Sequence, residues 1–309
     1  MISLIQSLGD STTFSDLSSR PQSQALDWIL ADPFSADGLS DDRLVQRFAL
    51  ATFWYSTDGA DWDHDGWLTS TNECDWDMDG IGCSPEFVVE RLDLSGYSLF
   101  GSIPSEVGLF TQLTSLSLFN NTLTGSIPSK LGLLSQLLTL SLEINQLTGS
   151  LPSELGLMEQ LLYLSLESNQ LTGSLPSELG LMEQLQELNL FDNQLKGSLP
   201  SELGLMEQLL YLSLEINQLT GSLPSELGLM DQLLGLFLDA NQLTGPLPSE
   251  LGLLVGLEGL FLFDNKLTGS LPSELGLLSQ LSNLGLDGNE LTGSVPPPPL
   301  FWWSRVYQY

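Results

Sequence analysis

Residues 164–187 read LSLESNQLTGSLPSELGLMEQLQE, and close variants of this phrase recur along most of the chain. A fixed period of about 20–50 residues is typical of a solenoid, in which each repeat buries its apolar face against its neighbours. We therefore expect one elongated α/β solenoid rather than two globular domains. The first leucine of the phrase returns every 24 residues in nine coils, at Leu92, Leu116, Leu140, Leu164, Leu188, Leu212, Leu236, Leu260 and Leu284.

The invariant columns of the phrase predict the scaffold. L-x-L predicts a short strand whose leucines point inward while the x positions face solvent. Glycine and proline follow in every coil, from Gly101 to Gly293 and from Pro104 to Pro296, and predict a turn-rich convex side. The first coil carries Tyr97 where the others carry an asparagine whose buried amide is expected to satisfy backbone groups at a bend. These asparagines are Asn121, Asn145, Asn169, Asn193, Asn217, Asn241, Asn265 and Asn289.

The sequence before and after the coils has a different character. Residues 22–30 and the stretch from Ser40, a plausible N-cap, to about Tyr55 predict two helices that cover the end of the solenoid. After Ser294 the phrase breaks into a run of prolines and aromatics. The expected organisation is a flexible lead-in (1–20), a helical and disulfide-pinned N-terminal cap (21–87), nine 24-residue repeats (88–296) and a Pro/aromatic tail (297–309).

Charge narrows the choice of partner. Only 8 Lys and Arg stand against 39 Asp and Glu, a formal net charge of −31. Nucleic acid is therefore excluded as a partner and an anionic membrane surface is disfavoured, whereas a basic or neutral ligand is favoured. The sequence contains no apolar run long enough to span a membrane, and its first residues do not read as a secretory signal.

Two motifs resemble a known family. L-T-G-S-L-P at a 24-residue period resembles the plant-type leucine-rich repeat, found in polygalacturonase-inhibiting proteins and receptor-like kinase ectodomains. CDWDMDGIGC at 74–83 resembles that family's N-terminal cap, and RLVQRFALATFWYSTDGADW at 43–62 resembles leading regions of diatom and algal leucine-rich repeat proteins. The resemblance implies a right-handed, horseshoe-like solenoid, a disulfide between Cys74 and Cys83, and an extracellular or membrane-associated ectodomain. The chain departs from the family in having no C-terminal cysteine cap and no kinase or membrane segment.

Catalytic and metal chemistry find little support in the sequence. The only histidine, His64, lies in the cap, so no nucleophile–histidine arrangement can be built around the repeats, and we expect neither an enzyme nor a cofactor. The residues Asp75, Asp77, Asp79 and Glu86 fit the calcium-loop pattern D-x-D-x-D-G-x5-E. Because a cysteine and a proline interrupt that pattern, we interpret the segment as part of the cap and keep calcium as a secondary candidate.

The outward strand positions are the candidate binding site, because they vary where the rest of the phrase repeats. Exposed aromatics interleaved with acids are typical of an interface. A glycan on Asn120, in the sequon Asn120-Asn121-Thr122, would lie beside this face. The candidate concave residues are Phe119, Glu143, Tyr163, Glu167, Glu187, Phe191, Tyr211, Glu215, Phe237, Asp239, Phe261 and Phe263.

The sequence leaves several functions open. The preferred hypothesis is non-enzymatic recognition of a protein, peptide or glycan through the concave face, as in a receptor ectodomain. The alternatives are an inhibitor of a secreted hydrolase and, more remotely, a structural or ice-binding protein, because Thr and Ser of T-G-S form two hydroxyl columns. Two columns of acidic residues are interpreted as a solvated surface. They are Glu106, Glu154, Glu178, Glu202, Glu226, Glu250 and Glu274, and Glu159, Glu183, Glu207 and Asp231.

Overall fold

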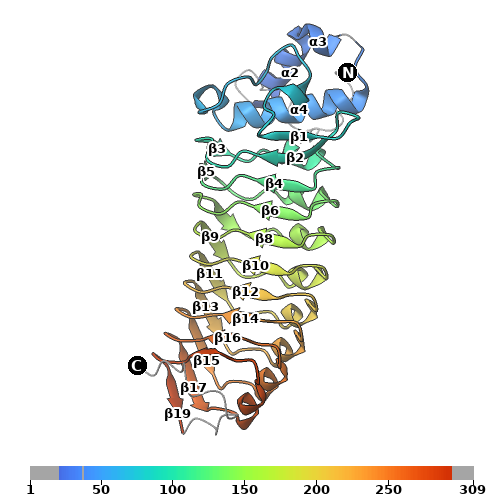
Figure 1. Cartoon of the computed structure of the whole chain (residues 1–309). Coiled ribbons are helices and arrows are strands. Elements are labelled where there is room, and N and C mark those ends of the chain that lie inside the picture. Colours follow the sequence, from blue (N-terminus) through green and yellow to red (C-terminus); the bar gives the residue numbers. More distant parts are fainter. Residues whose placement is uncertain (1–20, 37, 294–309) are drawn as a thin grey trace.

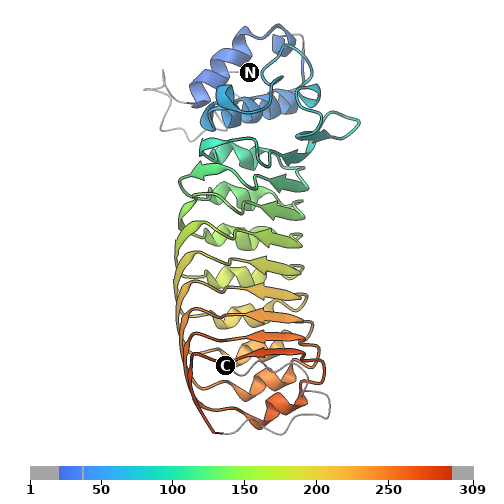
Figure 2. The same ribbon diagram turned by 60° about the vertical axis from the view of Figure 1, so that its left-hand side comes forward.

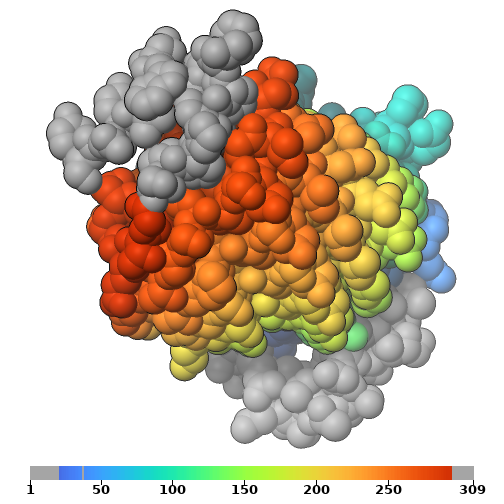
Figure 3. Space-filling view, turned by 90° about the horizontal axis from the view of Figure 1, so that it is seen from below, coloured from blue at the N-terminus to red at the C-terminus, as the bar shows by residue number. Residues whose placement is uncertain are grey.

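The computed structural model describes residues 21–36 and 38–293, so the expected lead-in and tail lie outside the described residues. The described chain is an elongated stack of coils with helices at its N-terminal end (Figures 1 and 2). Seen from below, successive coils are staggered rather than superposed, so the stack is not a straight column (Figure 3). The expected solenoid with a helical N-terminal cap is confirmed.

The main sheet holds ten strands, one after another along the stack. All neighbours are parallel except β1 with β2, and equivalent leucines stand side by side, as Leu188 does with Leu164 and Leu212. The L-x-L strands are therefore confirmed. Their bounds are β1 (Ile81–Cys83), β2 (Val89–Asp93), β4 (Ser115–Ser117), β6 (Thr139–Ser141), β8 (Tyr163–Ser165), β10 (Glu187–Asn189), β12 (Tyr211–Ser213), β14 (Gly235–Phe237), β16 (Gly259–Phe261) and β18 (Asn283–Gly285).

A second parallel sheet forms where the sequence predicted only turns. The backbone of each coil bonds to the previous one there, as Gln170 N does to Leu147 O at 2.8 Å, and glycines such as Gly149 (φ 82°) take up left-handed backbone. The prediction of a turn-rich side was thus incomplete, because the Q-L-T-G segments of successive coils pair with one another as parallel strands. The strands are β7 (Thr148–Ser150), β9 (Gln170–Gly173), β11 (Gln194–Gly197), β13 (Gln218–Gly221), β15 (Gln242–Gly245), β17 (Lys266–Ser270) and β19 (Glu290–Thr292), with β3 (Phe100–Ser102) and β5 (Thr122–Thr124) as a separate pair.

A 3₁₀ turn follows the proline in each of the first eight coils, whose prolines lie within the described residues. The glycine inside it is required by close stacking, because a Cβ on Gly156 would lie 2.3 Å from the backbone oxygen of Glu178 in the next coil. Successive turns therefore touch through their backbones. The turns span Ser105–Leu109, Ser129–Leu133, Ser153–Leu157, Ser177–Leu181, Ser201–Leu205, Ser225–Leu229, Ser249–Leu253 and Ser273–Leu277.

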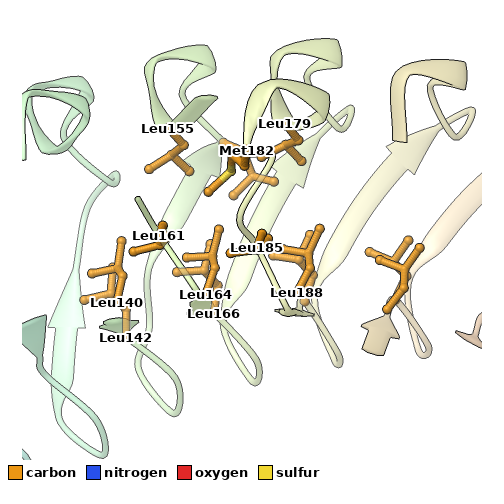
Figure 4. Close-up of a cluster of buried hydrophobic side chains, with 14 of the residues drawn as sticks. Leu140, Leu142, Leu155, Leu161, Leu164, Leu166, Leu179, Met182, Leu185 and Leu188 are labelled. Carbon is orange, nitrogen blue, oxygen red and sulfur yellow. The ribbon is translucent and has the colours of Figure 1, made fainter. Parts of the chain in front are cut away.

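The core is a set of leucine columns that run the length of the stack (Figure 4). Leu140, Leu164 and Leu188 lie one above another, and Leu179 and Met182 close the core from the side of the 3₁₀ turns. Burying each such side chain contributes about 1.5–3 kcal/mol. Because every coil repeats the same contacts, the core has no centre and grows with each repeat.

The asparagine column behaves as the sequence predicted. In one coil, Asn145 Oδ1 accepts from the backbone N–H of Leu123 at 3.0 Å, and its Nδ2 donates to the carbonyls of Leu118 at 2.9 Å and Leu142 at 3.1 Å. Each amide thus joins two coils at the bend after the strand. The bend itself is made by a residue in the left-handed region, Ile144 at φ 55° in this coil.

The cap holds the two expected helices and one more. Helices α2 (Pro21–Ala31) and α4 (Asp41–Ser56) pack through a small apolar cluster, and the hydroxyl of Ser40 caps α4 by accepting from Arg43 N at 3.4 Å. The additional helix α3 (Pro33–Ala36) begins because the side chain of Asp32 accepts from the N–H groups at its start. The disulfide implied by the resemblance is present and joins Cys74 to Cys83.

Candidate functional site

The outward face of the main sheet carries all twelve predicted site residues. They stand at the outward strand positions or directly after the strands, in rows that run along the stack. One row places Glu187 between Tyr163 and Tyr211 on neighbouring strands. The two tyrosines are 43% and 40% exposed, and the hydroxyl of Tyr163 donates to Gln186 Oε1 at 3.2 Å. These rings are therefore available to a ligand.

A second row, just past the strand ends, is mostly acidic. The hydroxyl of Ser141 donates to Glu143 at 2.6 Å, and that of Ser213 donates to Glu215 at 2.9 Å. Glu167 accepts instead from the side-chain amide of Asn189 in the next coil. The strands thus fix the direction of each carboxylate, and Phe191 lies in the same row between Glu167 and Glu215.

Two acids of this row are held in an environment that disfavours their charge. Burial raises the pKa of Glu215, and the nearby charge of Glu167 raises it further. Burial, together with the charges of Glu215 and Asp264, raises the pKa of Asp239 to about 6. Among the described residues the salt bridges involve only Arg43, Arg47 and Arg91, so none of them neutralises Glu215 or Asp239.

A cluster of phenylalanines adjoins the acids towards the C-terminal end. The rings of Phe237 and Phe261 are stacked at 5.3 Å, and Phe263 meets Phe261 edge-on at 6.4 Å. These three side chains are half-buried because they lie against glycines of the sheet. A Cβ on Gly235 would lie 2.6 Å from the Phe237 ring, and one on Gly285 would lie 3.0 Å from that of Phe263.

This glycine floor was missed by the sequence analysis. Gly235 and Gly259 occupy the same outward strand position in two successive coils, and Gly285, in the next coil, occupies the other outward position beside Phe261. Earlier coils carry larger residues at both positions. These glycines were a usable signal, because glycine within a strand often marks a close approach. These glycines leave room for the rings close to the sheet, and Asp239, two residues after Phe237, is only 8% exposed.

Three other residues named in the sequence analysis lie apart from these acids and phenylalanines. Phe119 stands near the N-terminal end of the face, two coils before Tyr163. Asn120 is exposed, has φ 55° and donates its backbone N–H to Glu143 O at 3.0 Å, so its side chain lies at the edge of the face. His64 stacks on Tyr97 at 3.7 Å in the cap region.

The calcium candidates are not brought together. Within residues 21–36 and 38–293 no group of three or more His, Cys, Asp or Glu side chains is arranged to hold a metal ion. Asp75 ends a 3₁₀ turn, while Asp77 accepts from the N–H of Gly80 at 3.0 Å. The disulfide between Cys74 and Cys83 closes the same segment into a structural loop.

Comparison with known proteins agrees with this geometry. The Leucine Rich Repeat family model matches residues 112–134, 160–182 and 184–206, each of which contains a coil's 3₁₀ turn. The chain is a leucine-rich repeat protein. No curated protein sequence matches it.

Solved structures similar to this leucine-rich repeat protein include receptor ectodomains from Arabidopsis thaliana. The ectodomain of the receptor kinase GASSHO1/SCHENGEN3, in complex with CASPARIAN STRIP INTEGRITY FACTOR 2, has a TM-score of 0.70 and 40% identity over 74% of this chain and 27% of that chain. The Arabidopsis receptor kinase HAESA, in complex with the peptide hormone IDA and the co-receptor SERK1, has a TM-score of 0.68 and 32% identity over 84% of this chain and 43% of that chain. The present chain spans less than half of either ectodomain.

A plant ice-binding protein is also similar, with a TM-score of 0.63 and 25% identity over 84% of this chain and 89% of that chain. Among the helices of the described residues, none has the length and apolar character needed to cross a membrane. The similar proteins thus include both ligand-binding ectodomains and an ice-binding protein.

Proposed function

We propose that this leucine-rich repeat protein is a non-enzymatic recognition module that binds a basic or neutral ligand through its concave face, as a receptor ectodomain does. The observation that carries the proposal is the Phe237–Phe261–Phe263 cluster on its glycine floor beside Asp239. The scaffold does not need this arrangement, because the leucine and asparagine columns already account for the stability of these coils.

The chemistry of the face favours a ligand that combines a cation with an apolar group. Aromatic side chains bury about 150–250 Å² each and dominate interface energetics. Glu215 and Asp239 have no cationic partner among the described residues, so a ligand ammonium or guanidinium would replace lost hydration with a charge-assisted hydrogen bond. A peptide with a basic residue next to an aromatic or aliphatic one meets both conditions. The two Arabidopsis ectodomains were solved with a peptide hormone or a named factor, which supports a peptide as ligand class.

A peptide selection tests the proposal. Peptides selected on the wild-type chain from a random library are expected to be rich in Lys or Arg beside an aromatic residue. Tyr211→Ala combined with Phe261→Ala should weaken their binding by about tenfold or more, because the rings are the anchors. Ser198→Ala combined with Ser222→Ala, on the second sheet, serves as the matched control. Equal binding to all three proteins would refute the concave site.

The compartment and the kind of ligand are further parts of the proposal. A disulfide in a small cap is typical of an oxidising, extracytosolic environment, which supports an extracellular ectodomain.

A secreted hydrolase is an alternative ligand of the concave face. In that case purified chain would inhibit the hydrolase in a dose-dependent way, and the Tyr211/Phe261 double variant would not.

Ice binding remains a second candidate because the similar plant protein is matched over nearly its whole length. The hydroxyl columns lie on the second sheet, but the strand register shifts them: Ser150, not Thr148, stands beside Thr172. Lys196 and Pro246 interrupt the columns. A thermal hysteresis measurement decides the matter, and activity lost in Thr220→Leu with Thr244→Leu would establish ice binding in place of ligand recognition.

A further inference from the structure

The eight 3₁₀ turns that follow the prolines each end in a leucine, and in all but the first turn this leucine is exposed to solvent. Seven of these side chains are between 52 and 60% exposed, and they follow one another coil by coil. We name this column the leucine ridge. It consists of Leu133, Leu157, Leu181, Leu205, Leu229, Leu253 and Leu277.

The ridge has no role in the scaffold. In one coil Leu179 and Met182 are completely buried and fill the core, while Leu181 between them is 53% exposed. Contiguous apolar surface on a soluble protein usually marks an interaction site. A polar residue at this position would leave the core contacts unchanged, so the repeated leucine requires another explanation.

The ridge is closely spaced. The glycine column brings successive turns into backbone contact, as at Gly180, where a Cβ would lie 2.2 Å from Glu202 O. With a spacing of about 5 Å between coils, as between neighbouring strands, the seven leucines extend over about 30 Å. That length equals an α-helix of about 20 residues, whose turns are also about 5.4 Å apart.

Acidic side chains border the central coils of the ridge, from Leu157 to Leu229, in two columns, whereas Lys130 stands beside Leu133 and Val255 takes the second column's place beside Leu253. Residues three apart in a 3₁₀ turn share a face, so Glu178 stands beside Leu181. On the other side, Glu159 and Glu183 line the same shallow hollow as Leu157 and Leu181, with a volume of about 350 Å³. The acids continue along the ridge at Glu154, Glu202, Glu207, Glu226, Asp231, Glu250 and Glu274, all of them exposed.

The molecule itself shows what covers such a surface. Leu109, the equivalent leucine of the first coil, is only partly exposed because it packs against the apolar cluster of helices α2 and α4. Glu106, the first acid of the column, accepts a hydrogen bond at 3.3 Å from Gln22 Nε2 of α2. Here helices place apolar side chains on the leucine and a polar donor on the glutamate.

We propose that the leucine ridge is a docking surface for a basic amphipathic α-helix of a partner protein, lying along the stack from coil to coil. Its apolar side chains, one per turn, would enter the gaps between successive leucines, as in helix-in-groove recognition. Lysine or arginine on both flanks would face the two acidic columns. A second copy of this chain is a poorer occupant, because it would bring the same acidic columns and a further formal charge of −31.

The test uses a synthetic probe. It is a fluorescein-labelled peptide of about 18 Leu and Lys residues, long enough to form a helix, with all leucines on one face. A permuted peptide of the same composition, with the leucines distributed around the helix, is its control. Binding is followed by fluorescence anisotropy at about 0.15 M salt, where non-specific long-range attraction is screened.

The matched variants separate the ridge from general acidity. Leu181→Gln with Leu205→Gln and Leu229→Gln should weaken binding of the amphipathic peptide by about tenfold or more. These leucines are more than half exposed, so the melting temperature should be unchanged. Glu183→Gln with Glu207→Gln should weaken binding of the amphipathic peptide less than the triple leucine substitution does. Ser198→Ala with Ser222→Ala, directly after strands β11 and β13 of the second sheet, should leave binding of the amphipathic peptide unchanged.

Four results would overturn the proposal. The first is equal binding of the permuted and amphipathic peptides, and the second is unchanged binding by the triple leucine variant. The third is a dimer of the wild-type chain in sedimentation that the triple variant lacks, since this would make a second copy the occupant. Binding to phosphatidylcholine vesicles that depends on the same leucines would likewise replace the helix by a lipid surface.

Discussion

At the scale of single residues, each interior asparagine holds four backbone groups of two coils. Asn193 accepts from Leu171 N at 3.0 Å and donates to the carbonyls of Leu166, Leu190 and Phe191 at 3.0–3.2 Å. We expect Asn193→Leu to lower the free energy of unfolding by about 1–3 kcal/mol or more, because buried groups lose their partners. Urea unfolding measures this change. The control is Asn289→Leu in the last described coil, where the amide is partly exposed and water can replace it, so the loss should be smaller.

Asp239 predicts a pH dependence of stability. Its pKa is raised to about 6 from an ordinary 3.8, so folding favours the protonated carboxyl. As pH rises from about 4 to above 6 the folded state must accept an unfavourable charge, and stability falls over that window. We expect Asp239→Asn to be more stable than wild type at pH 7 by about 1–3 kcal/mol, an advantage that disappears near pH 4. Urea unfolding at both pH values tests this, and a constant difference would contradict it.

The sequence could predict the role of Asn193 but not the pKa of Asp239. The role of Asn193 follows from an amide repeated at one place in eight coils, where the bend frees backbone groups. The pKa of Asp239 depends on burial and on carboxylates from two other coils, Glu215 and Asp264. No local pattern carries that information, because it arises only when the coils are stacked.

At the scale of elements, the glycines of the 3₁₀ turns set the distance between coils. A Cβ on Gly204 would lie 2.3 Å from the backbone oxygen of Glu226, and backbone cannot rotate away as a side chain can. We expect Gly204→Ala to lower the free energy of unfolding by about 1–3 kcal/mol through forced separation of the turns. Gly256→Ala is the control, because its Cβ would meet nothing closer than 3.9 Å. Similar effects of the two substitutions in thermal unfolding would argue against backbone contact as the cause.

Two arginines, one buried in the cap and one exposed on strand β2, allow a second comparison between elements. Arg47 of α4 is fully buried, pairs with Asp32 at 2.6 Å and Glu73 at 3.0 Å, and lies over the Trp76 ring. Arg47→Met should destabilise the protein by about 3–5 kcal/mol, because buried Asp32 loses its counter-charge and buried Glu73 keeps only Arg43. Arg91→Met removes an exposed pair with Asp93 and an exposed hydrogen bond to the carbonyl of Asp79, and should cost about 0–1 kcal/mol. Near-UV circular dichroism of the cap tryptophans during urea unfolding would follow the change, and equal midpoints would contradict the assignment.

Helices and strands could be predicted where the residues of the element itself carry the pattern. The L-x-L strands and the helix from Ser40 follow from periodicity and a capping side chain within a few residues. The second sheet was missed because Q-L-T-G resembles a turn in isolation and becomes a strand only by pairing with its copies. Helix α3 was missed because Asp32-Pro33 also marks the end of α2, and the capping role of Asp32 depends on its fold-back onto Ser35.

At the scale of the whole molecule, the repeat produces one scaffold and three different surfaces. The outward face of the main sheet varies from coil to coil and carries the predicted aromatics and acids, although the three phenylalanines are half-buried and Asp239 is buried rather than exposed. The second sheet carries interrupted hydroxyl columns, and the turns carry the leucine ridge. Sequence reasoning assigned the repeated leucine, asparagine, glycine and proline columns to the scaffold, and the exposure of Leu181 and its equivalents shows that one leucine column is surface instead.

The acidic columns of the whole stack predict how stability responds to salt. Exposed carboxylates such as Glu178, Glu202 and Glu226 repeat from coil to coil at a spacing of about 5 Å, and their repulsion is screened as ionic strength rises. The melting temperature should therefore increase between about 0.01 M and 0.5 M sodium chloride, over which the Debye length shortens from about 30 Å to a few ångströms. Glu178→Gln with Glu202→Gln and Glu226→Gln should melt higher than wild type at low salt and respond less to added salt. Differential scanning calorimetry measures how steeply the melting temperature of each protein rises with salt concentration. If the two proteins respond equally, the columns contribute no net repulsion, and the charge of −31 acts only through its diffuse field.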